Sequence, residues 1–449
     1  MDVPVSRRNF LRVSLLASST AVTGGILAAC AAPPPPAASK SDAPASKPAI
    51  DAAARPTEAV AAKPADAKPA ETAAKPAAEA PTAAAQPAAG AKPAEKAASS
   101  AAAPVAAPAT QGQVITWKWQ SAFGNTDVFH QMGVDLIQKI DEMSAGRLKI
   151  DLLPNGAVVP FGQIIDATHQ GLLDGGIGVP AYWFGKNKAL SLWGTGPSFG
   201  MDADMMIAWV QYGGGAAMYR ELVQEVLKLD VESFFGPPMP TQPLGWFKNE
   251  IKSPDDLKGL KYRTVGLSAD LFKELGVAVT ILPGPEIVPA LERGVIDGAE
   301  FNNPSSDKLL GFADVVKVLM VQSYHQPVEY LEFLVNKKKY EALPKDLQAV
   351  VKYAVMAESA DATWKYFMDA NSKDLADFKS RGVQVIQTPR SVLEAQLKAW
   401  DVIVDRETKA DPFFDKVIKS QREWATRVVP LRSEVMVDNR PAFEYYFKR

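Results

Sequence analysis

The stretch between residues 31 and 112 places the tightest limit on what this chain of 449 residues can fold into. It consists almost wholly of Ala, Pro, Lys, Glu, Ser and Thr, and short units such as Ala62–Ala65 and Ala91–Ala94 recur in it. With no aromatic side chains and scarcely any large aliphatic ones, the stretch cannot bury enough apolar surface to offset the entropy lost on ordering. Its prolines also interrupt the helix that alanine favours. The composition therefore predicts a disordered tether, and a folded part that begins near Val114.

The first 30 residues have the features of an export signal. The run Ser6–Arg12 (SRRNFLR) is similar to a twin-arginine motif, and the apolar stretch Val13–Ile26 is too short and too polar to span a bilayer. The stretch ends in Leu27–Cys30 (LAAC), which is similar to a lipobox, so we expect Cys30 to carry a lipid. The alternative is an ordinary signal peptide in which Cys30 is incidental. Lipidation predicts a chain anchored at the outer face of the cytoplasmic membrane or in the periplasm.

Charge and rare residue types exclude several kinds of site. The formal net charge is −2 without a Lys/Arg block, so nucleic acid is not an expected partner. A single cysteine excludes an intrachain disulfide and a Cys-based metal centre. His130, His169 and His325 lie far apart, which argues against a His-ligated zinc. We find no Ser-His-Asp or Cys-His arrangement and no phosphate-binding Gly-rich loop, so nothing in the pattern favours an enzyme.

Strand and helix patterns alternate through the remaining chain, which predicts an α/β fold with parallel sheets covered by helices. Residues 113–238 are expected to form a first lobe and residues 239–328 a second. Residues 329–449 are expected to return to the first lobe and to continue as a long inter-lobe helix and C-terminal helices. The expected strands are Val114–Trp119, Leu148–Leu153, Gly175–Val179, Leu244–Phe247, Leu260–Arg263, Ala278–Leu282, Ile296–Phe301 and Tyr330–Val335.

Three polar side chains, Gln242, Arg263 and Glu300, stand where short strand-like runs turn into loop or helix. In open α/β sheets, ligands bind beside the carboxyl ends of the strands. We therefore expect these three side chains to lie close together at one edge of a sheet. Arg263 offers a planar guanidinium group, which can donate two parallel hydrogen bonds to a carboxylate. Glu300 and Gln242 offer hard oxygen donors for Na⁺ or Ca²⁺. The alternatives are a surface ion pair for Arg263 and a surface or helix-capping role for Glu300.

The region from Val114 to Arg449 resembles the extracytoplasmic solute receptors of tripartite ATP-independent periplasmic (TRAP) transporters. The resemblance rests on blocks in the order of that family, namely Glu142–Leu148, Ile251–Arg263, Gly294–Glu300 and Val335–Lys338. It implies a two-lobed periplasmic-binding-protein (Venus flytrap) fold with a long connecting helix and a helical C-terminus. It also implies lobes that close on a solute and deliver it to a membrane permease. A ligand-binding subunit of a membrane sensor and, less readily, a sodium-dependent hydrolase are the alternatives.

Within the family, Gln242 followed by Gly245–Phe247, and Glu300 followed by an aromatic residue, are similar to the branch that binds 2-oxo or 2-hydroxy monocarboxylates. The resemblance implies that Arg263 pairs with the ligand carboxylate. It also implies that Gln242, Glu300 and the backbone carbonyl of Phe301 hold a Na⁺ or Ca²⁺ that bridges to the ligand, without an organic cofactor. Phe301 stands where that branch often has Trp.

Tyr182, Phe301 and Asn302 complete the set of expected substrate contacts. Tyr182 and Phe301 suit the apolar core as well as the lining of a cleft, so their role stays open at this point. The aromatic residues near the C-terminus are compatible with the pairing of some relatives into homodimers through their C-terminal helices.

Overall fold

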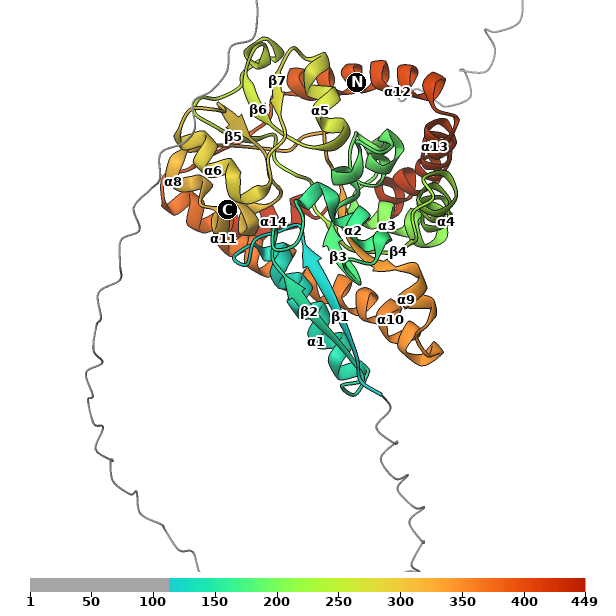
Figure 1. Cartoon of the computed structure of the whole chain (residues 1–449). Coiled ribbons are helices and arrows are strands. Elements are labelled where there is room, and N and C mark those ends of the chain that lie inside the picture. Colours follow the sequence, from blue (N-terminus) through green and yellow to red (C-terminus); the bar gives the residue numbers. More distant parts are fainter. Residues whose placement is uncertain (1–112, 449) are drawn as a thin grey trace, which may run out of the picture. The chain divides into compact units, whose positions relative to one another are not determined.

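Two mixed β-sheets organise residues 113–448, the part of the chain that the computed structural model describes (Figure 1). The predicted export signal, the predicted lipidation site Cys30 and the predicted tether all lie outside these residues. None of the helices in the described part is long and apolar enough to cross a membrane.

The first sheet has the strand order β2-β1-β3-β10-β4. Strand β1 pairs in parallel with β2 and β3, as the strand–helix alternation predicts, whereas β10 is antiparallel to both β3 and β4. The parallel pairing that the alternation predicts thus holds for β1, β2 and β3 and does not extend to β10, because the chain re-enters this sheet from the other one. The strands are β1 (Ile115–Ser121), β2 (Leu148–Leu153), β3 (Gly175–Gly178), β4 (Val231–Met239) and β10 (Glu329–Asn336).

The second sheet has the order β11-β9-β5-β8-β6-β7 and is also mixed, since β5 is antiparallel to β8 and β9. The strand expected over Ile296–Phe301 shortens to two residues, although backbone bonds from Asp297 to Lys261 and from Glu300 to Arg263 prolong its pairing with β6. The strands are β5 (Gly245–Phe247), β6 (Lys261–Arg263), β7 (Ala278–Thr280), β8 (Gly298–Ala299), β9 (Val318–Val321) and β11 (Gln384–Gln387).

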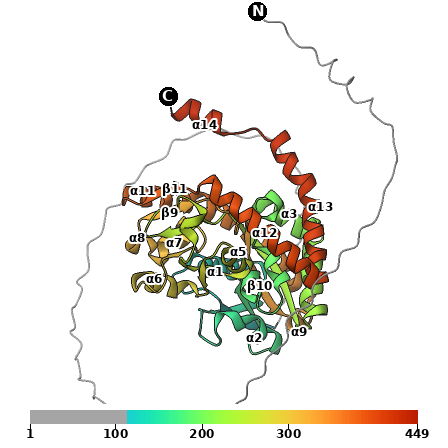
Figure 2. The same ribbon diagram turned by 90° about the horizontal axis from the view of Figure 1, so that it is seen from above.

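Helices connect and cover the strands (Figures 1 and 2). The α-helices are α1 (Val128–Met143), α2 (Ile164–Gln170), α3 (Ala203–Tyr212), α4 (Gly215–Arg220), α5 (Gly266–Glu274), α6 (Gly284–Glu292), α7 (Pro304–Leu310), α8 (Phe312–Val315), α9 (Lys337–Glu341), α10 (Lys345–Ala362), α11 (Asn371–Ser380), α12 (Arg390–Ala410), α13 (Pro412–Val435) and α14 (Arg440–Phe447). Short 3₁₀ segments are η1 (Phe161–Gln163), η2 (Pro180–Trp183), η3 (Lys188–Trp193), η4 (Ser198–Gly200) and η6 (Pro254–Leu257), and π-helical segments are η5 (Glu221–Val226) and η7 (Thr363–Ala370).

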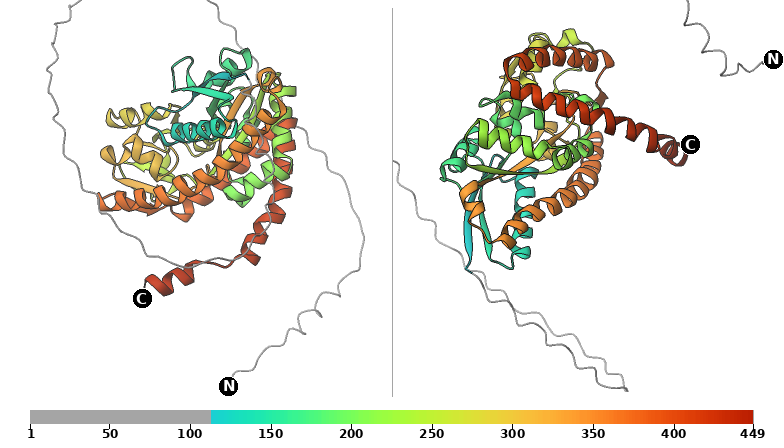
Figure 3. Two further views of the ribbon diagram at one scale, coloured as in Figure 1. Left: turned by 90° about the horizontal axis from the view of Figure 1, so that it is seen from below. Right: turned by 90° about the vertical axis from the view of Figure 1, so that its right-hand side faces the viewer.

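Three connections join the two sheets. Residues 240–244 lead from β4 to β5 and residues 322–328 lead from β9 to β10, and the N–H of Gln242 donates to the carbonyl of Gln326 between them at 3.1 Å. The third is the predicted long helix, which runs without a break through α10, η7 and α11 (Figure 3). Lys139 of α1 pairs with Glu358 of α10 at 2.8 Å, and Lys308 of α7 pairs with Asp374 of α11 at 2.8 Å.

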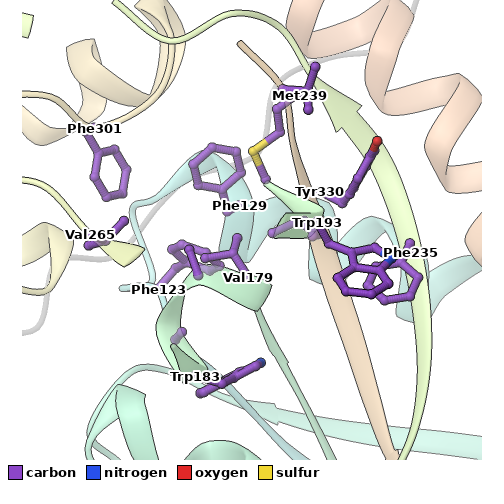
Figure 4. Packing of buried hydrophobic residues seen from close by; sticks show 14 of the residues in the cluster. Phe123, Phe129, Val179, Trp183, Trp193, Phe235, Met239, Val265, Phe301 and Tyr330 are labelled. Carbon is purple, nitrogen blue, oxygen red and sulfur yellow. The ribbon is translucent and has the colours of Figure 1, made fainter. Parts of the chain in front are cut away.

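Apolar side chains of the two sheets meet beside these connections. Figure 4 shows Phe123 and Phe129, from the first sheet's side, facing Phe301 and Val265. The ring centroids of Phe129 and Phe301 lie 6.0 Å apart, within the range of favourable aromatic pairs. The segments that follow β1, β6 and β8, together with the start of α1, therefore pack against one another.

Glu332 is a fully buried carboxyl group in the first sheet. Trp183 donates its indole N–H to Oε2 at 2.6 Å, and the Ser233 hydroxyl donates to Oε1 at 2.7 Å. Burial raises the pKa of Glu332 from 4.5 to about 7, because the charged form loses its water. The folded chain therefore holds a proton over a pH range in which the unfolded chain releases it.

We expect this proton to make the fold less stable as pH rises from about 4.5 to about 7. Glu332→Gln should flatten that dependence by up to a few kcal/mol, at about 1.4 kcal/mol per pKa unit, because its neutral amide replaces the protonated acid. Urea unfolding at both ends of the range measures the effect. Glu423→Gln, at an exposed glutamate, is the control, and parallel pH profiles for the wild type and Glu332→Gln would contradict the assignment.

Candidate functional site

Arg263 and Glu300 form a buried ion pair at the end of two adjacent strands. Arg263 is the last residue of β6 and Glu300 follows β8, which pairs in parallel with β6. Arg263 Nη1 donates to Glu300 Oε1 at 2.9 Å and to its backbone carbonyl at 3.1 Å, while Nε donates to the carbonyl of Leu282 at 2.9 Å. These contacts fix the plane of the guanidinium group, and they leave Nη2 without an acceptor among the described residues.

A glycine allows the third strand to approach Glu300. Gly245, the first residue of β5, has a φ of +141°, and a Cβ atom there would lie 2.6 Å from the carbonyl oxygen of Ala299. A side chain at this position would therefore push β5 away from β8 and displace Glu300.

Gln242 reaches the site from an inter-lobe connection, so the prediction that it ends a strand is wrong. It lies between β4 and β5, flanked by Pro240 and Pro243, which have no N–H for a strand ladder. Its side chain is nevertheless buried, and Nε2 donates to Glu329 Oε2 at 3.1 Å.

Glu329, the first residue of β10, is a member of the site that the sequence did not identify. Because β10 runs antiparallel to β3, its amino end lies at the edge where β3 ends. The rule that ligands bind at the carboxyl ends of parallel strands does not point to Glu329, because Glu329 stands at the amino end of its strand. A side chain at Gly194 would come within 3.1 Å of the Glu329 carboxyl group, so this glycine leaves room for it.

Three buried oxygens near Arg263 have no hydrogen bond of normal geometry, namely Gln242 Oε1, Glu300 Oε2 and Glu329 Oε1. The side chains of Thr264 and Gln326, which also lack partners, lie beside Glu300 and Glu329 respectively. Burial raises the pKa of Glu300 from 4.5 to about 7, against the opposing effect of Arg263. Burial, and next the negative charge of Glu300, raise the pKa of Glu329 well above its ordinary value. Buried oxygens without partners are costly, and a proton or a hard cation would satisfy them.

The described residues contain no cluster of three His, Cys, Asp or Glu side chains that could hold a metal ion. The three unpartnered oxygens near Arg263 instead belong to two carboxylates and one carboxamide. Such a mixed oxygen set fits Na⁺ or Ca²⁺, which accept carboxylate, amide and backbone carbonyl ligands together.

A narrow cavity of about 10 Å³, the room of about one water molecule, lies beside these groups. The predicted residues Tyr182, Arg263, Phe301 and Asn302 all line it, and so does Glu329. The Arg263 guanidinium carbon lies 5.6 Å from the centre of the Phe301 ring, close enough for a cation–π contact. The other residues that line it are Phe123, Phe129, Val179, Met239 and Val265 (Figure 4).

Tyr182 and its neighbour Trp183 have different surroundings. Tyr182 lies in η2, directly after β3, and packs edge-on against Phe161 with ring centroids 4.9 Å apart. Trp183 is buried and donates to Glu332 instead. The cavity thus has an aromatic wall from the first sheet's side, and its charged groups, Arg263 and Glu329, come from β6 and β10.

Comparisons with known proteins agree with this geometry. Residues 121–410 match DctP, the bacterial extracellular solute-binding protein family 7. The chain is 31% identical over 316 residues to the "Monocarboxylate 2-oxoacid-binding periplasmic protein all3028" of Nostoc sp., over 70% of this chain and 84% of that protein.

Solved structures of TRAP periplasmic solute-binding proteins are also similar. One from Colwellia psychrerythraea, with bound calcium and pyruvate, is 32% identical with a TM-score of 0.68, over 72% of this chain and 98% of that one. One from Pseudoalteromonas atlantica, with bound sodium and pyruvate, is 28% identical with a TM-score of 0.66, over 72% and 97%. One from Bordetella bronchiseptica, a dimer with calcium and picolinate, is 27% identical with a TM-score of 0.69, over 75% and 97%.

The family resemblance and the two-lobed α/β fold predicted from the sequence are thereby confirmed. The chain belongs to bacterial extracellular solute-binding protein family 7, and it is a solute-binding receptor of the TRAP transporter type.

Proposed function

We propose that this receptor binds a small 2-oxo or 2-hydroxy monocarboxylate in the cavity beside Arg263 and delivers it, unaltered, to a TRAP membrane permease. The observation that carries the proposal is a cavity lined by the buried Arg263 and Glu329, with Glu300 bonded to Arg263 and Gln242 bonded to Glu329 directly behind them. Arg263 Nη2 supplies the N–H donor for the carboxylate. The unpartnered oxygens of Gln242, Glu300 and Glu329 supply a site for the cation.

The size of the cavity favours a small acid. Its volume of about 10 Å³ is the room of about one water molecule in this conformation, far below the roughly 300–1,000 Å³ of pockets for drug-sized ligands. The aromatic wall formed by Phe123, Phe129, Tyr182 and Phe301 suits a short apolar substituent on the acid. The printed names of the similar proteins, which bind 2-oxoacids, pyruvate or picolinate, support the same class of ligand.

We further propose that Gln242 Oε1, Glu300 Oε2, Glu329 Oε1 and the backbone carbonyl of Phe301 hold Na⁺ or Ca²⁺. A ligand carboxylate next to Glu300 and Glu329 would bring three negative groups into one buried place, which is costly without a counter-charge. Arg263 supplies one positive charge and Ca²⁺ would supply the other two, whereas with Na⁺ one of the two glutamates would keep a proton. Calcium and sodium in the similar structures support this assignment.

The wider organisation of the receptor completes the proposal. Residues 113–238 and 239–328 form the two lobes, and the remaining residues return to the first lobe and continue as the long helix and the C-terminal helices. Closure about the three connections encloses the acid. A lipid on Cys30, preceded by a twin-arginine signal and followed by the 31–112 tether, would hold the receptor at the outer face of the cytoplasmic membrane. The working unit would be a homodimer.

A thermal-shift screen of organic acids, with and without Ca²⁺, tests the function. We expect pyruvate and related 2-oxo acids to raise the melting temperature, since a ligand at one hundred times its Kd stabilises by about 2.7 kcal/mol. Propionate, which has the carboxylate but no 2-oxygen, is the matched probe and should give a smaller shift. Mass spectrometry should recover the bound acid unchanged. A chain that responds only to sugars, or that converts the acid, would contradict the proposal.

A further inference from the structure

A second cavity adjoins the solute cavity, and all three connections between the sheets line it. Its volume is about 170 Å³. Pro243 comes from the first connection, Gln322 from the second, and Phe367 and Asn371 from the long helix. Asn302 lines both this cavity and the solute cavity, so the two lie on either side of it. We call the second cavity the hinge pocket, because any change in the angle between the lobes moves its walls.

Two irregular segments of backbone contribute to the hinge pocket. The long helix widens into the π-helical segment η7 where Phe367 joins the lining, and such turns are frequent at functional sites. Gln322 has a φ of +72°, in the left-handed region that residues other than glycine rarely adopt. This residue is exposed, and its carboxamide forms no hydrogen bond within the described part of the chain. A free hydrogen-bonding group therefore stands at the mouth of the pocket.

The size and the apolar walls of the hinge pocket suit a compound with one ring. An apolar cavity of about 150 Å³ holds a benzene molecule, and the hinge pocket has a similar volume. Phe367, Val321 and Pro243 offer apolar contacts for such a ring. The free carboxamide of Gln322 adds a donor and an acceptor for one polar substituent.

The charge of the hinge pocket disfavours an organic acid. Asp307 lines the pocket and is 1% exposed. Its carboxylate accepts the indole N–H of Trp246 at 2.8 Å and the backbone N–H of Asn302 at 3.3 Å, but it pairs with no cation among the described residues. Burial raises the pKa of Asp307 from 3.8 to about 6, so the group is ionised at pH 8. An anion in the pocket would therefore meet a like charge without compensation.

We infer that the hinge pocket binds a small uncharged compound with one ring, and that this compound strengthens closure of the lobes on the solute. In this structure the solute cavity has the room of about one water molecule, and the rings of Phe129 and Phe301 lie 6.0 Å apart beside it, so the lobes are closed. The pocket in its present shape therefore belongs to the closed arrangement. A compound that fits this shape binds the closed state better and shifts the equilibrium towards it.

Benzamide and benzoate, which have nearly the same shape and differ in charge, are the probes for the pocket. At pH 8, with and without saturating pyruvate, benzamide should bind in calorimetry with a stoichiometry of one. Benzoate should not bind once pyruvate fills the solute cavity. An absence of saturable benzamide binding, displacement of benzamide by pyruvate, or equal binding of benzoate in the presence of pyruvate would each overturn the inference.

Two variants locate the benzamide. Val321→Phe should fill the pocket and abolish binding, and Gln322→Gly should weaken it about three- to tenfold, the loss expected for one hydrogen bond. Glycine suits the left-handed backbone at residue 322, so we expect the second variant to fold. Lys228→Gly, at an exposed residue outside the pocket with a φ of +56°, is the matched control and should leave benzamide binding unchanged. Full benzamide affinity in both pocket variants would overturn the inference.

The coupling to closure is measured as the ratio of the pyruvate Kd without benzamide to that with saturating benzamide. We expect a ratio of at least about five in the wild type, the lower end of the usual range for coupled ligands, and a ratio of about one in Val321→Phe. Each variant is compared with itself, so a change in its basal affinity does not affect the ratio. A wild-type ratio of one or below would overturn the coupling.

This coupling rests on the proposed function, whereas the pocket does not. Small-angle X-ray scattering with benzamide alone therefore supplies a measure of closure that needs no solute. Benzamide should lower the radius of gyration of the wild type and leave that of Val321→Phe unchanged. A chain that binds benzamide and closes, but does not bind pyruvate, would contradict the proposed function and support the hinge pocket. A radius of gyration that rises with benzamide would overturn the inference.

Discussion

Arg263→Ala should bind the organic acid at least about a hundredfold more weakly than the wild type in calorimetry with Ca²⁺ present. The side chain is 1% exposed, so the ligand carboxylate that it meets has lost its water. Removal of one partner of a buried charge pair costs about 3–5 kcal/mol, which is roughly two to four orders of magnitude in Kd. Arg263→Lys should fail almost as badly, because one ammonium group cannot bond Glu300, Leu282 and the ligand in the same plane.

The ion pair with Glu300 requires a second variant, since Arg263→Ala also leaves that carboxylate without its partner. Arg263→Ala with Glu300→Gln removes both charges, and we expect affinity to stay low because the ligand still lacks its arginine. Arg293→Ala, at an exposed arginine that ends α6, is the matched control. Recovery of affinity in the double variant would place the carboxylate elsewhere and leave Arg263 as the counter-charge of Glu300 alone.

Removal of cations should weaken acid binding by a similarly large factor. In chelated, sodium-free buffer we expect a loss of up to about a hundredfold, the upper part of the usual range for coupled ligands, and recovery on addition of Na⁺ or Ca²⁺. Coupling is reciprocal, so the acid should strengthen cation binding by the same factor. Because burial places the pKa of Glu300 at about 7 without a cation, cation binding should release a proton and strengthen as pH rises through that value.

Three buried glutamates allow a matched comparison. Glu300→Gln and Glu329→Gln keep the size of the side chain but lose its charge, and each should blunt the dependence on cation. Glu332→Gln makes the same change three residues further along β10, at a carboxyl group bonded to Trp183 and Ser233, and should leave that dependence intact. Tight acid binding that does not depend on either cation would contradict the proposed cation site. It would not contradict the proposed contact between Arg263 and the ligand carboxylate.

The local pattern of the sequence predicts those parts of the site that neighbouring residues determine. Arg263 ends an apolar run, Glu300 follows another, and the pairing of β6 with β8 brings them together. The long helix is predictable for the same reason, since its apolar spacing continues from Lys345 to Ser380.

The remaining parts depend on how distant segments pair. β9 and β11 are short, and they become strands by pairing with each other across more than sixty residues of chain. The role of Glu329 depends on the antiparallel direction of β10, which only the return from the second sheet determines. Gln242 enters the site through a connection between sheets, which no periodic pattern marks.

The hydrogen bond between Gln242 and Gln326 has a mechanical consequence. It ties the two crossing segments into a ribbon, and the Thr241 hydroxyl adds a second tie to the carbonyl of Pro327 at 3.2 Å. A tied ribbon bends easily across its width but resists shear and twist, and the long helix adds a third line of attachment. Of the six rigid-body degrees of freedom between two lobes, one rotation therefore stays soft. We therefore expect opening and closing to follow a single arc, which would present the charged and aromatic walls to each ligand in the same alignment.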